Sequence, residues 1–210
     1  IVRTMGMRLT KLRPIGGCVV RLGRIAAGKD GPEPMRAEPR TVWLTAEGGR
    51  FDPHVQWARA GTQLALRSRV RGELHAHAYR DSLATTQFNF TVPGGAEKVD
   101  VADAQLSKPG VYFVTEDSRA AFTAYVHVVE HPYVDLTSDS ARPGREGGEY
   151  VLEDVPPGEY ELLCWHEGMT QWFQSEQVRS YRYSPEVVLR KRVVVGPGRP
   201  SYVDFELPAP

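Results

Sequence analysis

Histidines are the residues of this chain whose spacing best suits the binding of a metal ion. His75 and His77 are two positions apart, so in a β-strand both imidazole rings lie on the same side. A third donor such as His54 or His127 would complete a site of the kind that holds Cu(II), Zn(II) or Ni(II). Exposed strand histidines beside charged neighbours explain the same spacing, and this is the interpretation we favour. We therefore predict no metal site, with His75, His77 and His127 as the weak candidates.

The two cysteines suggest a second kind of soft-metal site. Cys164, His166 and Met169 follow the pattern Cys-x-His-x-x-Met, and the first two would share one face of a strand. We favour a buried thiol beside a structural histidine. Cys18 and Cys164 either pair in an oxidising compartment or remain two separate buried thiols, and the second alternative is favoured.

Sequence motifs of common enzymes are missing. The chain contains no G-x-S-x-G motif, no P-loop and no dinucleotide-binding fingerprint. Acidic pairs occur at Glu116-Asp117 and Glu153-Asp154, where turn-rich sequence makes solvated loop carboxylates the expected state. We predict that the protein is not an enzyme.

The charge and composition of the chain are those expected of an ordinary soluble globular protein. The 210 residues carry 26 basic and 26 acidic side chains, so the net charge gives no general attraction to nucleic acid. No apolar run approaches the roughly 20 residues of a membrane-spanning helix. The basic residues are concentrated before Asp30, and Arg8, Lys11 and Arg13 of this arm are candidates for contact with an acidic partner. The first residue is Ile1 rather than Met, which is compatible with removal of an export signal.

Short β-rich runs separated by glycine and proline recur along the chain, and no window has a helical period. This pattern predicts an all-β protein of the sandwich type. Residues 23–39 and 138–148 have the composition of loops, and His131-Pro132 is a plausible domain joint. The predicted strands are Cys18–Leu22, Arg40–Thr45, Val55–Arg59, Gln63–Arg69, Glu73–Tyr79, Gln87–Val92, Glu97–Val101, Gly110–Thr115, Ala121–Val129, Tyr133–Leu136, Glu149–Leu152, Gly158–His166, Val187–Val195 and Tyr202–Leu207.

Several short sequence motifs between residues 16 and 167 occur in an order and with a spacing that are typical of one protein family. They are Cys18–Leu22, Phe51–Val55, Ala60-Gly61-Thr62, Leu74–Tyr79, Phe88-Asn89, Pro109-Gly110, Ala124-Tyr125-Val126, His131-Pro132-Tyr133, Val155–Tyr160 and Trp165-His166-Glu167. Together they resemble bacterial cupredoxin-like proteins of the methylamine-utilisation or plastocyanin-like type. The resemblance implies a cupredoxin-like Greek-key β-sandwich (16–130) followed by a small transthyretin-like or carboxypeptidase-regulatory-like β-sandwich module (131–210). The distribution of basic residues adds a basic N-terminal arm (1–15).

The same resemblance locates the copper ligands of the family, which are two histidines, a cysteine and a weak axial methionine. Here the first histidine position falls on Leu74, or on His75 with a shift of one residue. Thr115 takes the cysteine position and Ser118 the second histidine position. Ala121 or Phe122 takes the methionine position. A threonine hydroxyl does not ionise near neutral pH and binds Cu(I) poorly, so we expect no copper or other cofactor.

These expectations favour a non-catalytic accessory or scaffolding protein in the periplasm or outside a bacterial cell. It would bind other proteins, within a larger envelope assembly, through a cupredoxin-like sandwich that has lost its copper. The alternatives are a copper-binding electron-transfer protein and a carbohydrate-binding module. No nucleic-acid partner is expected. Aromatic residues and arginine are enriched at interfaces, and the candidate partner-binding residues are Trp172, Phe173, Tyr181, Arg182 and Tyr183, together with Arg8, Lys11 and Arg13.

Overall fold

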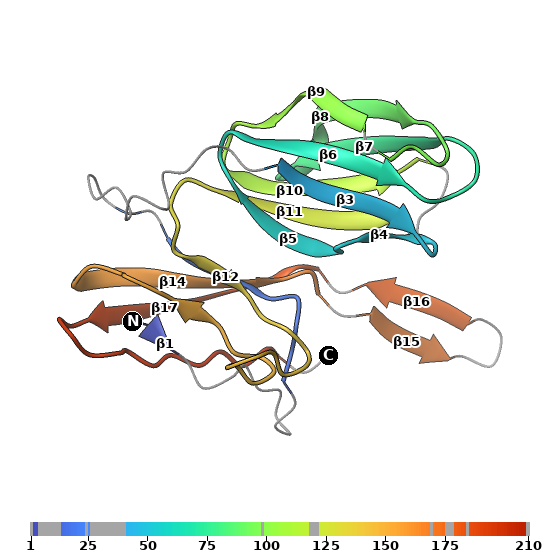
Figure 1. The fold of residues 1–210 in the computed structure, drawn as a ribbon. Helices are drawn as coiled ribbons and strands as arrows, with labels where there is room; N and C mark the ends of the chain where they lie inside the picture. The colour runs from blue at the N-terminus through green and yellow to red at the C-terminus, as the bar shows by residue number, and fades with distance from the viewer. Residues whose placement is uncertain are drawn as a thin grey trace. The chain divides into compact units, whose positions relative to one another are not determined.

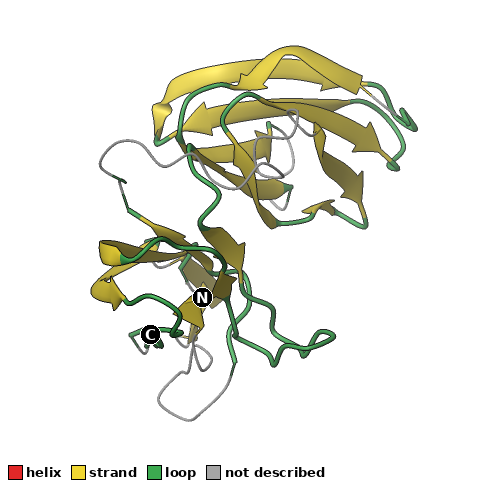
Figure 2. Ribbon diagram, turned by 60° about the vertical axis from the view of Figure 1, so that its left-hand side comes forward, coloured by secondary structure: helices red, strands yellow, loops and turns green. Residues whose placement is uncertain are grey.

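In the computed structural model, every regular element of the described residues is a β-strand (Figures 1 and 2). The prediction of an all-β chain is therefore confirmed. Among the described residues, no helix is long and apolar enough to cross a membrane. The backbone alone is described at 2–3, 82–85, 100–105, 170–174 and 179–183. The described residues are 2–3, 14–23, 25, 41–97, 99–117, 122–168, 170–174, 179–183 and 185–208.

The chain divides into two compact units. The middle unit is Asp30–Pro132, and the split unit combines Ile1–Lys29 with Tyr133–Pro210. Two sheets form the middle unit, and the parallel pairs within them are β5 with β11 and β3 with β6. The first sheet has the order β5 (Val55–Arg59), β11 (Thr123–Val129), β10 (Gly110–Glu116), β7 (Leu74–Arg80), β8 (Ser82–Val92). The second has the order β4 (Arg50–Asp52), β3 (Thr41–Glu47), β6 (Thr62–Ser68), β9 (Val99–Leu106).

Alternating side chains from both sheets build the core of the middle unit. Strand β7 contributes Leu74, Ala76 and Ala78, which are buried, and the residues between them fall on the outer face of the sheet. At one end of this core, the ring of Phe122 packs edge-on against Phe51, with ring centroids 5.6 Å apart. The inner face is thus filled mainly by hydrocarbon. His75, His77 and Thr115 fall on the outer face, whereas Glu116 at the end of β10 is buried.

The split unit is built around one four-stranded sheet. Its core includes Leu22 and Leu162 from that sheet and Tyr150 and Phe205 from segments outside it. The order of the sheet is β12 (Val134–Leu136), β2 (Val19–Leu22), β14 (Gly158–His166), β17 (Val187–Val195). Two smaller antiparallel pairs are β1 (Val2–Arg3) with β13 (Val151–Leu152), and β15 (Thr170–Gln174) with β16 (Arg179–Tyr183).

Several predictions differ from the structure. Residues 16–130 do not form one domain, because Val19–Leu22 pairs with β12 and β14 in the sheet of the split unit. The segment 170–183, which shows no clear strand pattern in sequence, forms the strands β15 and β16. Residues 202–207 form no strand, although Phe205 and Leu207 are buried as the alternation predicts.

Candidate functional site

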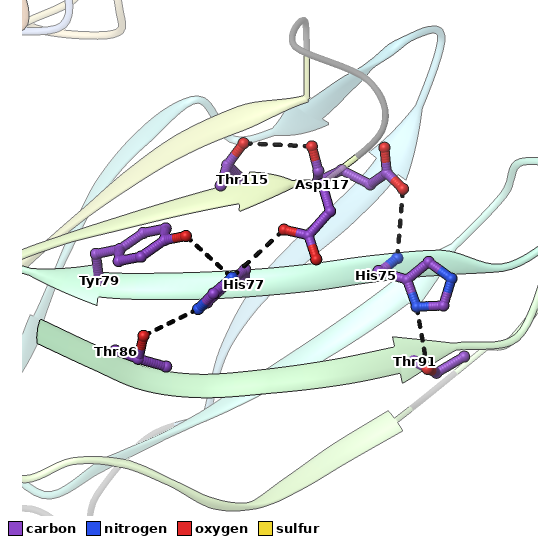
Figure 3. Close-up of polar contacts among 8 residues, drawn as sticks. His75, His77, Tyr79, Thr86, Thr91, Thr115 and Asp117 are labelled. Atoms are coloured by element: carbon purple, nitrogen blue, oxygen red, sulfur yellow. Dashed lines mark hydrogen bonds and ion pairs between the residues drawn. The ribbon is translucent and has the colours of Figure 1, made fainter. Parts of the chain in front are cut away.

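The outer face of the middle unit carries a polar cluster at the position where the resemblance places copper ligands (Figure 3). His75, His77 and Tyr79 alternate with the buried residues of β7, so all three fall on this face. Strand β10 pairs with β7 so that Thr115 lies directly opposite His77. The predicted common orientation of His75 and His77 is therefore confirmed.

His77 is the centre of this cluster, and both nitrogens of its ring have polar neighbours. Nδ1 lies 3.0 Å from the Tyr79 hydroxyl oxygen and 3.4 Å from Oδ1 of Asp117. Nε2 lies 3.1 Å from Oγ1 of Thr86. The ring also stacks on Tyr79, with centroids 4.2 Å apart, and the side chain is 17% exposed. A hydrogen-bonded, half-enclosed imidazole of this kind would have to give up existing partners before it could bind a metal ion.

His75 is held by a second set of contacts. Its Nδ1 lies 3.2 Å from Oγ1 of Thr91 on the neighbouring strand β8. Its backbone N–H donates to Oε1 of Glu116 at 3.4 Å, and its carbonyl accepts from the N–H of Asp117 at 3.3 Å. Glu116 is 2% exposed. These two bonds join the end of β10 to β7.

The residues at the copper positions do not fit a type 1 copper centre. Leu74 and Phe122 are buried in the core and present only hydrocarbon. Thr115 offers a hydroxyl, which donates a long bond of 3.5 Å to the carbonyl of Glu116. A blue copper centre needs a thiolate ligand, and none of these three side chains can provide one. Ser118 and Ala121 lie outside the described residues.

The third histidine of the predicted metal set is far along the sheet from the first two. In register, His77 is opposite Thr115, and Thr115 is opposite Thr123 on β11. His127 lies four residues beyond Thr123, opposite Trp57 of β5. The other alternative, His54, donates from Nδ1 to the carbonyl of Thr123 at 2.9 Å. Across the described part of the chain, no three His, Cys, Asp or Glu side chains are grouped so that they could hold a metal ion.

The Cys-x-His pair lies in the split unit. Cys164 is fully buried, and His166 accepts at Nδ1 from the backbone N–H of Gly168 at 3.2 Å. Burial lowers the pKa of His166, against the opposing effect of the charges on Glu167 and Asp139. Between these two residues, Trp165 donates from Nε1 to Oε2 of Glu186 at 2.6 Å. Met169 lies outside the described residues.

The candidate partner-binding aromatics fall on the β15–β16 ribbon. Trp172 is opposite Tyr181, and Phe173 is opposite Ser180. Arg182 and Tyr183 are opposite Gln171 and Thr170 at the base of the ribbon. The basic candidates Arg8, Lys11 and Arg13 lie outside the described residues.

Five members of the polar cluster were missing from the predicted site: Tyr79, Thr86, Thr91, Glu116 and Asp117. Tyr79 has a signal in the sequence, because it continues the two-residue spacing of His75 and His77 along β7. Thr86 has none, since a β-bulge between β7 and β8 places it opposite Tyr79. Asp117 depends on where β10 ends, which the sequence does not mark.

No protein-family model matches this chain, and no curated protein sequence matches it. Two solved structures are distantly similar to it, and both are of amicyanin, a cupredoxin. The reduced state of a proline-to-phenylalanine amicyanin mutant is 9% identical and covers 42% of this chain and 82% of its own, with a TM-score of 0.33. An oxidised proline-to-glycine amicyanin mutant is also 9% identical and covers 52% of this chain and 98% of its own, with a TM-score of 0.32.

Proposed function

We propose that this chain is a non-catalytic accessory protein of a bacterial cell envelope, and that it binds another protein through the β15–β16 ribbon. In this proposal the middle unit is a cupredoxin-like sandwich without copper, and the split unit is the carboxypeptidase-regulatory-like module. The observation that carries the proposal is the ribbon itself. Among the described residues, β15 and β16 pair with each other and with no other strand.

A two-stranded ribbon is at best marginally stable in water, so a protein that retains one gains from a partner that covers it. Each outer edge of such a ribbon presents a row of backbone N–H and C=O groups. Strand β15, Thr170–Gln174, contains neither a charged residue nor a proline, which are the usual means of blocking a strand edge. This edge is therefore suited to accept a strand from another protein by main-chain hydrogen bonding.

The residue types of the ribbon support the same proposal. Trp172, Tyr181 and Tyr183 lie within two strands of five residues each, together with Arg179 and Arg182. Tryptophan, tyrosine and arginine are the residues that most often carry the binding energy of protein interfaces. The two arginines of β16 favour a partner with acidic residues beside the strand that it adds.

The polar cluster around His77 argues against electron transfer as the function. His77 is bonded to side chains of its own sheet, and Leu74, Thr115 and Phe122 supply no soft ligand. We therefore expect the middle unit to act as a rigid support.

A variant without the ribbon tests the proposal. His166 is paired with Val187, so the ribbon extends the β14–β17 hairpin and can be replaced without cutting the four-stranded sheet. We would replace residues 169–184 by Asn-Gly and use Tyr202→Ala as the control, since Tyr202 is 62% exposed in the same unit. Affinity-tagged chains would be gently extracted from the native cells and analysed by size-exclusion chromatography with light scattering.

The wild type and the Tyr202→Ala control should elute with a partner, at a mass well above the 23.4 kDa of the chain. The variant without the ribbon should elute at the mass of its own monomer and should still unfold cooperatively in urea. A wild-type protein recovered only as monomer would refute the binding function. A ribbon-less variant that still elutes with the partner would refute the assignment of the binding segment.

A further inference from the structure

Two thiols lie side by side in the core of the split unit. Cys164 of β14 is opposite Val20 of β2, and Cys18 is two residues before Val20. Residues two apart on a strand share a face, so Cys18 and Cys164 are diagonal neighbours on the same side of the sheet. Both are 0% exposed and belong to one apolar cluster with Leu22 and Leu162.

The two cysteine side chains are neighbours in this core. The Cys18 side chain, together with burial, raises the pKa of Cys164. The Cys18 thiol donates a weak bond to the carbonyl of Gly16 at 3.8 Å. Two neighbouring thiols can become a disulfide through a small movement of one strand.

That movement has to come from the backbone around Cys18, which hydrogen-bonds to Thr137 rather than to β14. Diagonal neighbours in an antiparallel pair have Cα atoms about 7–8 Å apart. A disulfide needs a separation of at most about 6.8 Å, so the two strands must approach by roughly 1 Å. The β2–β14 ladder ends at Val19 opposite Trp165, and Cys18 lies just outside it. Gly16 and Gly17 precede Cys18, and Gly17 has a φ of 72°, a conformation that glycine adopts without strain.

We propose that Cys18 and Cys164 form an intramolecular disulfide bond when the chain folds in an oxidising compartment. The bond would connect β2, which precedes the middle unit in sequence, to β14, which follows it. It would thereby close a loop that contains the whole middle unit. Long closed loops remove the most conformational freedom from the unfolded chain.

The oxidant in this proposal is a second disulfide, either glutathione disulfide or a thiol–disulfide oxidoreductase. One protein thiolate attacks a sulfur of the oxidant, which forms a mixed disulfide and releases one thiol. The other protein thiolate then attacks the bound protein sulfur, which forms the Cys18–Cys164 bond and releases the second thiol. Two electrons pass from the chain to the oxidant, and the two protons of the cysteine thiols end on the two thiols released.

Refolding in defined redox buffers tests the proposal on the wild-type chain. Reduced, denatured protein would be refolded with glutathione disulfide, denatured again in iodoacetamide and weighed by mass spectrometry. The expected product is about 2 Da lighter than the reduced chain and carries no alkyl group, because both thiols have been consumed. Chain refolded in reduced glutathione should carry two alkyl groups. Two alkyl groups after oxidative refolding, glutathione on either cysteine, or disulfide-linked dimers would each overturn the proposal.

The Cys18→Ala variant is the matched control, and it should retain one reactive thiol or one bound glutathione in the same buffer. A second measurement tests whether the disulfide stabilises the folded chain. Native oxidised chain should resist dithiothreitol more strongly than the same chain in urea, because both sulfur atoms are buried. It should also unfold at a higher urea concentration than the reduced chain. A lower midpoint for the oxidised chain would show that the bond strains the sheet and would overturn this role.

Discussion

The segment 202–207 should depend on the ring of Phe205 for its attachment to the split unit. Phe205 is fully buried, and its ring centroid lies 6.4 Å from that of Tyr150. Two polar contacts flank the ring: the Tyr150 hydroxyl donates to the carbonyl of Val203 at 2.8 Å, and Nζ of Lys191 donates to the carbonyl of Asp204 at 2.7 Å. Neither contact forms a ladder, so burial of Phe205, together with that of Leu207, is the main attachment.

We predict that Phe205→Ala lowers the free energy of unfolding of the split unit by about 3–5 kcal/mol. The hydrophobic free energy of burying the ring, which the variant loses, accounts for roughly 1.5–3 kcal/mol of this decrease. The rest comes from the cavity that remains between Tyr150 and the sheet, together with weaker docking of the two flanking polar contacts. A loss of this size is a large fraction of the stability of an ordinary domain.

Urea unfolding monitored by tryptophan fluorescence would measure the change. Trp165 is buried in the split unit, whereas Trp43 and Trp57 belong to the middle unit, so Trp→Phe backgrounds can report each unit separately. With a slope of about 1–3 kcal/mol per molar urea, the midpoint of the split unit should fall by about 2 M. The midpoint of the middle unit should stay unchanged.

Tyr202→Ala, three residues away and largely exposed, is the control and should change stability by less than about 0.5 kcal/mol. A loss below about 1 kcal/mol for Phe205→Ala would refute the reasoning, since it would mean that the segment is not part of the core. Equal losses for the two variants would refute it as well.

Three further predictions concern Gly110 at the start of β10, the half-buried His166 and the copper positions. Gly110→Ala should destabilise the middle unit by about 2 kcal/mol or more, because its φ is 145° and a Cβ would lie 2.6 Å from Oδ1 of Asp81. Gly196→Ala is the control and should be nearly neutral in the same urea assay, because the space around Gly196 is open. Burial lowers the pKa of His166 below its ordinary value of 6.5, so just below pH 6.5 the unfolded chain binds more protons than the folded chain. The split unit should therefore lose stability as the pH falls from 6.5 to the folded-state pKa. His166→Gln should remove this part of the dependence of stability on pH, and an unchanged dependence would contradict the role of His166. Added Cu(II) should give no intense thiolate-to-copper absorption band, because Leu74, Thr115 and Phe122 provide no thiolate, and a strong visible band that a chelator abolishes would contradict this.

Strands with strong alternation or continuous apolar runs could be predicted from sequence alone. Val55–Arg59, Gly158–His166 and Val187–Val195 have the predicted bounds in the structure. Tyr202–Leu207 shows where this reasoning stops. Its alternation correctly predicts which residues are buried. Whether a strand forms depends on backbone hydrogen bonds to a neighbouring strand, and here two of the carbonyls accept hydrogen bonds from the side chains of Tyr150 and Lys191 instead.

The pairing of strands that are distant in sequence could not be predicted from the sequence alone. Nothing local in Val19–Leu22 says that its neighbours are β12 and β14, so the predicted domain of residues 16–130 includes a strand of the other unit. The orientation of His75 and His77 follows from a local period of two and was predictable. The position of His127 was not, because it depends on β10 lying between β7 and β11.

The division of the split unit around the middle unit also sets an order for events as the chain emerges into the compartment where it folds. Strand β2 emerges before the middle unit, but the first of its two partner strands follows about 110 residues later. During this interval the middle unit has its complete sequence and can fold, whereas β2 waits with its apolar residues and backbone groups uncovered. A chaperone that shields β2 would therefore protect the chain during this interval.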